Sequence, residues 1–174
     1  MFTKVYWIET FDNGAAIGIM PRPRGNDWLE DEIERLAFHG VHTIVSLLER
    51  SEISELGLRD EEILCLKHTI DFINFPIPDR GLPVDQQSVI NLISELRQRL
   101  EQRKKIVVHC RMGIGRSSII AGATLMKDGM KAEKILAKIS EARELKVPDT
   151  KDQENWLKQF DPTYSRFITC ICLL

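Results

Sequence analysis

An uninterrupted apolar run followed at once by a glycine-containing loop constrains the fold of this chain most. The segment KIVVHC (105–110) lacks the alternation of a strand with one solvated face, so we expect it inside a sheet covered on both sides. The stretch HCRMGIGRSS (109–118) follows and leads into a helix predicted from Arg116 to Asp128. This order is typical of α/β proteins, which bind ligands beyond the carboxyl ends of their strands.

The other segments alternate between strand and helix patterns. The predicted strands are 5–10 and 15–20 around an Asp-Asn-Gly turn, then 41–48 and 66–77. The predicted helices are 28–40 with Asn26 or Asp27 as N-cap, 85–102, 132–144 and 152–160. Together they predict an α/β fold in which helices flank both faces of a central, mostly parallel sheet, in three layers.

Composition excludes several classes of function. The 174 residues suit one domain, and the net charge of −2 is unlike the basic excess of nucleic-acid-binding proteins. No apolar stretch reaches the length of a membrane span, and MFTKVYWIETFDNGAA lacks the pattern of a signal peptide. We therefore expect a cytoplasmic protein, monomeric, that does not bind nucleic acid and has no membrane span.

The four cysteines form no metal-binding pattern. They stand at 65, 110, 170 and 172, without a Cys-x-x-Cys pair, so we expect free thiols, no metal and no cofactor. The end of the chain, FITCICLL, is interpreted as a final strand or a docked tail, and lipidation or metal binding at Cys170 and Cys172 is the alternative.

The loop after the 105–110 strand has the composition of an anion site. A helix N-terminus presents unpaired N–H groups and the positive end of the helix dipole. Gly113 and Gly115 permit the non-standard backbone that directs successive N–H groups inward. Arg116 offers a guanidinium that holds two phosphoryl oxygens at once. The alternative is a tight turn that is merely polar.

Cys110 would lie at the base of this site, where the N–H groups favour its thiolate, the nucleophilic form. Ser117 is placed to donate a hydrogen bond to the sulfur. We expect His109 to hydrogen-bond backbone and fix the loop rather than to touch substrate.

The pattern His-Cys-x-x-Gly-x-x-Arg-Ser resembles the signature of the cysteine-dependent protein tyrosine phosphatase superfamily. The segments RPRG (22–25), 27–49 and FPIPDRGLP (75–83) resemble its compact dual-specificity branch, in the atypical and kinase-associated-phosphatase-like forms. The resemblance covers about residues 17–160 and implies one phosphatase domain over 1–174. It implies a phosphate-binding loop made of Arg111, Met112, Gly113, Ile114, Gly115 and Arg116.

Asp79, in the sequence Pro-Asp-Arg-Gly, is the candidate general acid. Such a reaction needs a carboxylic acid on a separate loop to protonate the leaving oxygen, and the family's acid occupies this kind of position. An ordinary β-turn is the alternative. Asp71, inside a strand pattern, and Asp85, suited to a helix N-cap, are the rival carboxylates.

Three further residues have open interpretations. Gln153 either positions the hydrolytic water or only starts the last helix. Arg143 either caps its helix, which we favour, or reaches the phosphate loop. Cys65 either forms a disulfide with Cys110 under peroxide or, as we favour, is an inert core residue. The side chains of Arg111 and Met112 would point outward and shape specificity.

These features predict hydrolysis of phosphomonoesters through a phosphocysteine. We expect phosphorylated proteins as substrates, with phosphotyrosine and also phosphoserine or phosphothreonine accepted. The alternatives are a phosphatase for phosphoinositides or other small phosphoesters, and a non-catalytic module that binds phosphate or docks a kinase. A rhodanese-type sulfur transferase is disfavoured by Gly-Arg-Ser and the upstream acid.

Overall fold

The structure is a computed structural model, and it describes residues 2–126 and 130–160. In chain order its elements are β1 (Tyr6–Thr10), β2 (Ala16–Pro21), η1 (Asn26–Trp28), α1 (Leu29–Phe38), β3 (Thr43–Ser46), α2 (Arg50–Glu55), α3 (Glu61–Lys67), β4 (Asp71–Asn74), α4 (Gln86–Glu101), β5 (Lys105–Cys110), α5 (Arg116–Leu125), α6 (Ala132–Arg143) and α7 (Lys151–Gln159). The final segment FITCICLL, with Cys170 and Cys172, lies outside the described residues.

The sheet is mostly parallel, as predicted. Its strand order is β1-β2-β5-β3-β4, in which only β1 runs antiparallel, against β2. The hairpin of β1 and β2 is the one that the Asp-Asn-Gly turn predicts. Strand β5 lies at the centre, between β2 and β3, so it is buried on both faces, as its unbroken apolar sequence requires.

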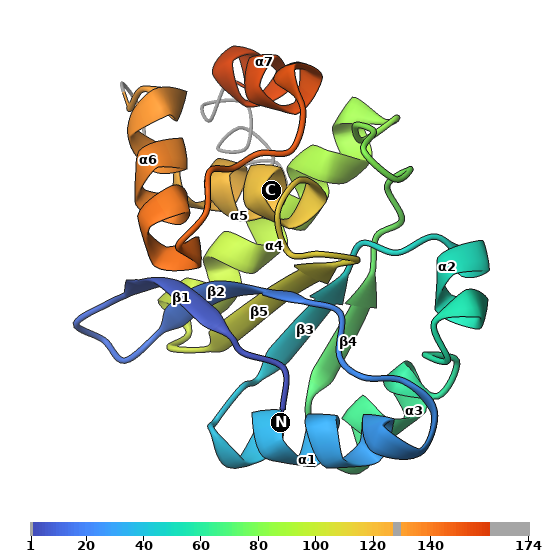
Figure 1. The fold of residues 1–174 in the computed structure, drawn as a ribbon. Helices are drawn as coiled ribbons and strands as arrows, with labels where there is room; N and C mark the ends of the chain where they lie inside the picture. Colours follow the sequence, from blue (N-terminus) through green and yellow to red (C-terminus); the bar gives the residue numbers. More distant parts are fainter. Residues whose placement is uncertain (1, 127–129, 161–174) are drawn as a thin grey trace, which may run out of the picture.

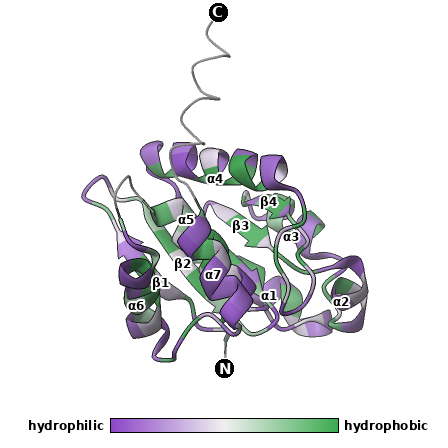
Figure 2. Cartoon of the chain, turned by 90° about the horizontal axis from the view of Figure 1, so that it is seen from above, coloured by the Kyte–Doolittle hydropathy of each residue, from purple (hydrophilic) through white to green (hydrophobic). Residues whose placement is uncertain are grey.

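Helices cover both faces of the sheet and confirm the three layers (Figure 1). Helices α4 to α7 lie on one face, and α1 and α3 lie on the other. Along β5 the side chains alternate, so Ile106, Val108 and Cys110 join the core under α4 to α7, whereas Val107 joins the core over α1 and α3. Figure 2 shows hydrophobic residues concentrated on the central strands and hydrophilic ones over α7.

The prediction of one strand over 66–77 is wrong. Leu66 and Lys67 belong to α3, and only Asp71–Asn74 pairs with β3. The helix escaped notice because α3 buries Glu61 and Cys65 while it exposes Ile63 and Leu66, which inverts the usual amphipathic pattern. Helix α2 was also missed.

One of the predicted helix N-caps is confirmed and another is wrong. Asp85 caps α4 by accepting a hydrogen bond from the Ser88 N–H at 2.7 Å, as its sequence position indicates. Neither Asn26 nor Asp27 caps α1 through its side chain, because a short 3₁₀ turn, η1, leads into that helix. No helix in the described ranges has both the length and the apolar sequence needed to span a membrane.

Candidate active site

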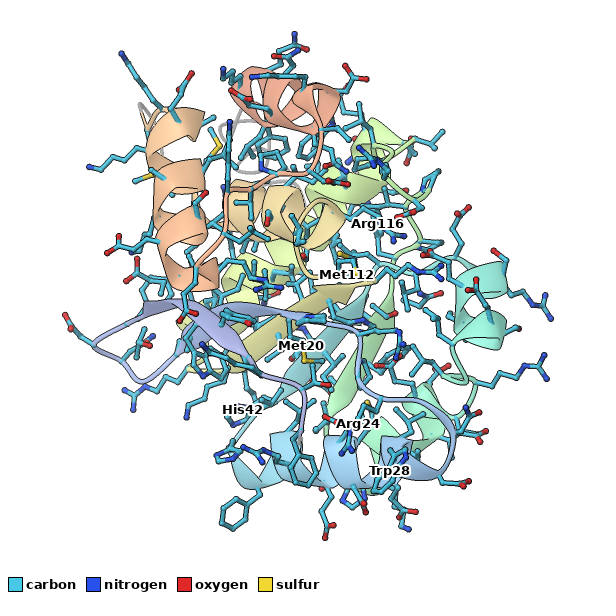
Figure 3. The ribbon with its side chains drawn as sticks, in the orientation of Figure 1. Met20, Arg24, Trp28, His42, Met112 and Arg116 are labelled. Carbon is cyan, nitrogen blue, oxygen red and sulfur yellow. The ribbon has the colours of Figure 1, made fainter. Side chains whose placement is uncertain are left out.

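The predicted phosphate loop joins the carboxyl end of β5 to the start of α5. Cys110 is the last residue of β5 and is buried, and Gly115 precedes the first residue of α5. Figure 3 shows Met112 and Arg116 at this end of the sheet, while Trp28 and Arg24 lie beside α1. The ten residues of α5 are all buried, so the helix N-terminus is fixed beneath the loop.

The two glycines of the loop serve different purposes. Gly113 has a φ of +64°, and a Cβ at this position would stand 2.4 Å from the backbone carbon of Met20. Gly115 has a φ of −88° and a ψ of −82°, so it lies outside the left-handed region, and its φ does not by itself require glycine. Glycine is required there for space, since a Cβ would stand 2.6 Å from the Gln153 amide oxygen.

The loop presents free N–H groups. Within the described residues, no backbone or side-chain group accepts a hydrogen bond from the N–H groups of residues 112–116. The carbonyls on the outer side are occupied: Arg111 O accepts from the Arg22 N–H at 3.3 Å, and Met112 O and Gly113 O accept from the Arg143 side chain. Free N–H groups at the positive end of a buried helix form a binding site for an anion.

The Cys110 sulfur lies 3.5 Å from the Ser117 hydroxyl oxygen, with the thiol as donor, so the two groups are in contact while the predicted donation from Ser117 to the sulfur stays a prediction. The predicted hydrogen bond from His109 to the loop backbone is not formed. His109 alternates with Cys110 along β5 and so faces the opposite side of the sheet, where its Nε2 lies 3.0 Å from Glu61 Oε1. This contact lacks hydrogen-bond geometry, so both ring nitrogens stay unpaired among the described residues.

Arg116 is held from three sides by other segments. Its Nη1 and Nη2 donate to Glu52 Oε2 and Oε1 at 2.7 and 2.9 Å, a two-point pair that occupies the end of the guanidinium. Nη1 also donates to the Ile77 carbonyl at 3.0 Å, and Nη2 to Asp79 Oδ1 at 2.8 Å. Among the described residues the Nε–H has no acceptor, so the edge formed by Nε and Nη2 faces the site with only Asp79 upon it.

Glu52 is the functional residue that sequence reasoning missed. Burial by itself would raise the pKa of this carboxyl, but the hydrogen bonds from Arg116 and from the Glu49 N–H outweigh burial and lower it. In turn, burial opposes the charge of Arg116, yet Glu52 raises the pKa of the guanidinium. The sequence signal, acidic residues at 49 and 52 forming a capping box, indicates a helix start but not a partner 64 residues away.

Among the three candidate carboxylates, the structure brings only Asp79 to Arg116. Asp71 begins β4, at the opposite end of the strands, and pairs with Arg99. Asp85 is occupied as the cap of α4. The Asp79 side chain is 55% exposed, on a turn closed by the Gly81 N–H donating to the Pro78 carbonyl at 2.8 Å. Asp79 therefore lies at the mouth of the site and in contact with its cation.

Gln153 is fully buried and starts the last helix, as one of its two interpretations predicts. It completes a capping box with Thr150 that starts α7, and its Nε2 donates to the Gly81 carbonyl at 3.1 Å. The amide thus links α7 to the turn that carries Asp79, beside Gly115. Whether it positions a water molecule stays a prediction.

Arg143 does not cap its helix, contrary to our preferred interpretation. The chain itself satisfies the end of α6, because Glu144 N–H donates to Glu141 O and Leu145 N–H donates to Ser140 O. The guanidinium instead reaches the phosphate loop, with Nε 3.0 Å from Gly113 O and Nη2 3.2 Å from Met112 O.

The side chains on the rim of the loop differ in charge and exposure. Met112 is 60% exposed, and Ile114 packs against the core under α4 to α7. The Arg111 guanidinium is bound by Glu55, with Nη2 2.6 Å from Oε1. The cation at the rim is thus already paired with a carboxylate.

Cys65 lies in the core on the α1 and α3 side of the sheet, whereas Cys110 lies in the core on the other side. Both are free thiols. Burial, followed by the charges of Glu61 and Glu62, raises the pKa of the Cys65 thiol, which disfavours the thiolate needed for disulfide exchange. These findings favour the interpretation of Cys65 as an inert core residue.

No group of three His, Cys, Asp or Glu residues able to hold a metal ion occurs in the described part of the chain.

Comparisons with known proteins agree with this geometry. Residues 18–130 match the family model described as "Polymorphic toxin system, DSP-PTPase phosphatase". Cyclin-dependent kinase inhibitor 3 of Rattus norvegicus is 24% identical over 143 residues, which cover 81% of this chain and 67% of the relative. The Sus scrofa protein of the same name is 28% identical over 136 residues, covering 76% and 63%. The chain thus spans about two thirds of the length of these relatives.

Two solved structures share the fold. Kinase associated phosphatase, crystallised with serine in place of its catalytic-site cysteine, superposes with a TM-score of 0.84 at 22% identity, covering 92% of this chain and 94% of the other. Tk-PTP in its active form gives a TM-score of 0.70 at 24% identity, covering 89% and 94%. The α/β fold and the three-layer arrangement are therefore those of known phosphatases.

Proposed function

We propose that this chain, which belongs to the DSP-PTPase family of cysteine-based phosphatases, hydrolyses phosphorylated proteins through a phosphocysteine on Cys110. The observation that carries the proposal is the convergence of four features: the Cys110 sulfur, the free N–H groups of residues 112–116, the open edge of Arg116 and the Asp79 carboxylate. We assign all of them to one phosphatase domain over residues 1–174, without a metal or a cofactor.

In the first step the Cys110 thiolate attacks phosphorus, and the bond to the leaving oxygen breaks. The three non-bridging oxygens are held by the loop N–H groups and by Nε and Nη2 of Arg116. The Ser117 hydroxyl, 3.5 Å from the sulfur, stabilises the thiolate before attack and again when it departs.

Asp79 supplies the proton that the leaving oxygen needs. In the free protein its carboxylate occupies Nη2 of Arg116, where a phosphoryl oxygen would bind. A phosphoryl dianion that takes over this edge releases the carboxylate from Arg116 and frees it to face the leaving oxygen. The acid then protonates the leaving oxygen as the P–O bond breaks.

The second step regenerates the enzyme. Water attacks the phosphocysteine, Asp79 accepts a proton from that water, and the P–S bond breaks to return the thiolate and release inorganic phosphate. We propose that Gln153, which lies beside Gly115 and donates to the turn that carries Asp79, holds this water.

We infer a phosphoprotein rather than a polyanionic headgroup as the substrate. A headgroup with several phosphates calls for free cations at the rim, whereas Arg111 is paired with Glu55 and the exposed neighbour is the apolar Met112. The similarity of this chain to a cyclin-dependent kinase inhibitor and to a kinase associated phosphatase supports a protein as the substrate. We propose that phosphotyrosine and phosphoserine or phosphothreonine are both accepted.

The test is hydrolysis of p-nitrophenyl phosphate with excess EDTA by the wild type and by Cys110→Ser. We expect turnover that survives EDTA and is lost in the variant. Absence of turnover in the folded, reduced wild type would favour a binding module, and turnover in Cys110→Ser would refute the assigned nucleophile.

The general acid is tested by Asp79→Asn. We expect this variant to lose about a hundred- to ten-thousand-fold in activity on alkyl phosphates and less on activated aryl phosphates. Equal retention on both would remove Asp79 from this role.

A further inference from the structure

We propose that Arg143 is a positioning residue, which turns the N–H groups of Gly113 and Ile114 toward the bound phosphoryl group by holding the carbonyls on the other side of the loop. The inference rests on the proposed function and adds a residue that lies 33 positions beyond Cys110, outside the motif. Arg143 is the last residue of α6, and the loop it contacts belongs to the connection from β5 to α5.

The contacts of Arg143 fix two successive peptide groups. Nε donates to Gly113 O at 3.0 Å and Nη2 donates to Met112 O at 3.2 Å. The peptide bonds here are trans, since the described residues contain a cis bond only before Pro148. In a trans peptide the N–H points away from the C=O of the same unit. Binding of these two carbonyls by Arg143 therefore directs the Gly113 and Ile114 N–H groups to the opposite side.

The preceding peptide is fixed in the same sense by a different donor. Arg111 O accepts from the Arg22 N–H, which directs the Met112 N–H away from β2. Three consecutive peptide groups thus have their carbonyls bound on one side of the loop, and no acceptor for their N–H groups occurs among residues 2–126 and 130–160. Gly113, with its φ of +64°, gives little resistance to a flipped peptide, so an external restraint is needed where Arg143 acts.

The Arg143 guanidinium is itself held in place. Its Cζ lies 4.1 Å from the centroid of the Tyr6 ring, so the cation stacks on an aromatic face supplied by β1. Helix α6 is joined to the same strand by the ion pair of Lys138 with Glu9. Lysine cannot replace Arg143 here, because its single ammonium cannot both stack on the ring and donate to two carbonyls as the planar guanidinium does.

The test compares Arg143→Met with Lys138→Met, a matched control that removes a cation from the same helix and its contact with β1 but does not touch the loop. The readouts are the affinity for orthovanadate by calorimetry, kcat and KM on p-nitrophenyl phosphate, and the melting temperature. We expect Arg143→Met to bind orthovanadate about ten- to hundred-fold more weakly, with kcat/KM lowered by up to about a hundred-fold. Lys138→Met should keep both values near wild type at a similar melting temperature.

Arg143→Lys serves if the methionine variant does not fold, and we expect it to lose at least about five-fold in orthovanadate affinity because one ammonium cannot hold both carbonyls. Wild-type affinity in a folded Arg143 variant would overturn this inference alone. An equal loss in Lys138→Met would also overturn it, since docking of α6 would then explain the effect. Failure of the wild type to bind orthovanadate would overturn the anion site and the inference together.

Discussion

The ion pair between Glu52 and Arg116 gives the most quantitative test of this site, through the substitution Glu52→Gln. Glu52 and Arg116 are 5% and 2% exposed, and two hydrogen bonds of 2.7 and 2.9 Å join them. Removal of one partner from a buried pair costs about 3–5 kcal/mol, because the other charge stays buried. Arg116 keeps the Ile77 carbonyl and Asp79, so we expect the lower end, about 3 kcal/mol.

The predicted loss can be measured by urea unfolding and by thermal melting. For a chain of this length, 3 kcal/mol corresponds to a fall in melting temperature of about 6–12 °C. We also expect kcat/KM to fall about a hundred-fold, because the guanidinium loses the partner that orients its open edge. Glu55→Gln is the matched control, since it removes an exposed carboxylate of the same helix from an arginine of the same loop and should change stability far less.

The effect should also depend on pH in a defined direction. The pKa of Glu52 is lowered in the folded protein below its ordinary value of 4.5. Its stabilising contribution is therefore complete above pH 4.5 and is lost as the pH falls through the folded value. The difference between wild type and Glu52→Gln should narrow below pH 4.5. A difference that stays constant down to pH 3, or one below about 0.5 kcal/mol at pH 7, would refute the reasoning.

Three further predictions concern the loop and its surroundings. Gly113→Ala should lower the free energy of unfolding in urea by more than about 2 kcal/mol and abolish orthovanadate binding. The reason is that an alanine at φ +64° would collide with the Met20 backbone. Near-normal orthovanadate binding would contradict this prediction. Gln153→Ala should cost about 1–3 kcal/mol in the same assay, because it removes a buried side chain and its part-buried hydrogen bonds to Thr150 and Gly81. The exposed Gln159→Ala should not have this cost. Mild peroxide should oxidise Cys110 without a bridge to Cys65, and a peptide map containing that bridge would show that the sheet opens.

The glycines show how far local sequence reasoning reaches. The sequence predicts that Gly113 adopts a conformation other residues avoid, since a turn between a buried strand and a helix must reverse within a few residues. It cannot predict why Gly115 is glycine, because the side chain that needs the space, Gln153, arrives from α7. The sequence around Gly115 cannot show that a side chain from a distant segment will need this space.

The helices after β3 show the opposite failure. Helix α3 exposes Ile63 and Leu66 and buries Glu61, so its hydrophobic pattern gives no helical period. Helix α2, which carries Glu52, was missed as well, and with it the partner of Arg116. Local sequence cannot reveal that a glutamate is buried, because only the approach of the arginine makes its burial favourable.

The sequence by itself determined the parallel sheet around β5, the loop at its carboxyl end, and the Cys110, Arg116 and Asp79 candidates. The sheet and the loop depend on neighbours within one turn or strand, where spacing and backbone preference are sufficient, whereas the choice of Asp79 also depends on the resemblance to the phosphatase superfamily. The tertiary structure alone decided that Cys65 lies on the opposite side of the sheet from Cys110, that Glu52 and Asp79 reach Arg116, and that Arg143 binds the loop. These outcomes depend on contacts between segments tens of residues apart, whose geometry is set by packing of the two cores rather than by any local pattern.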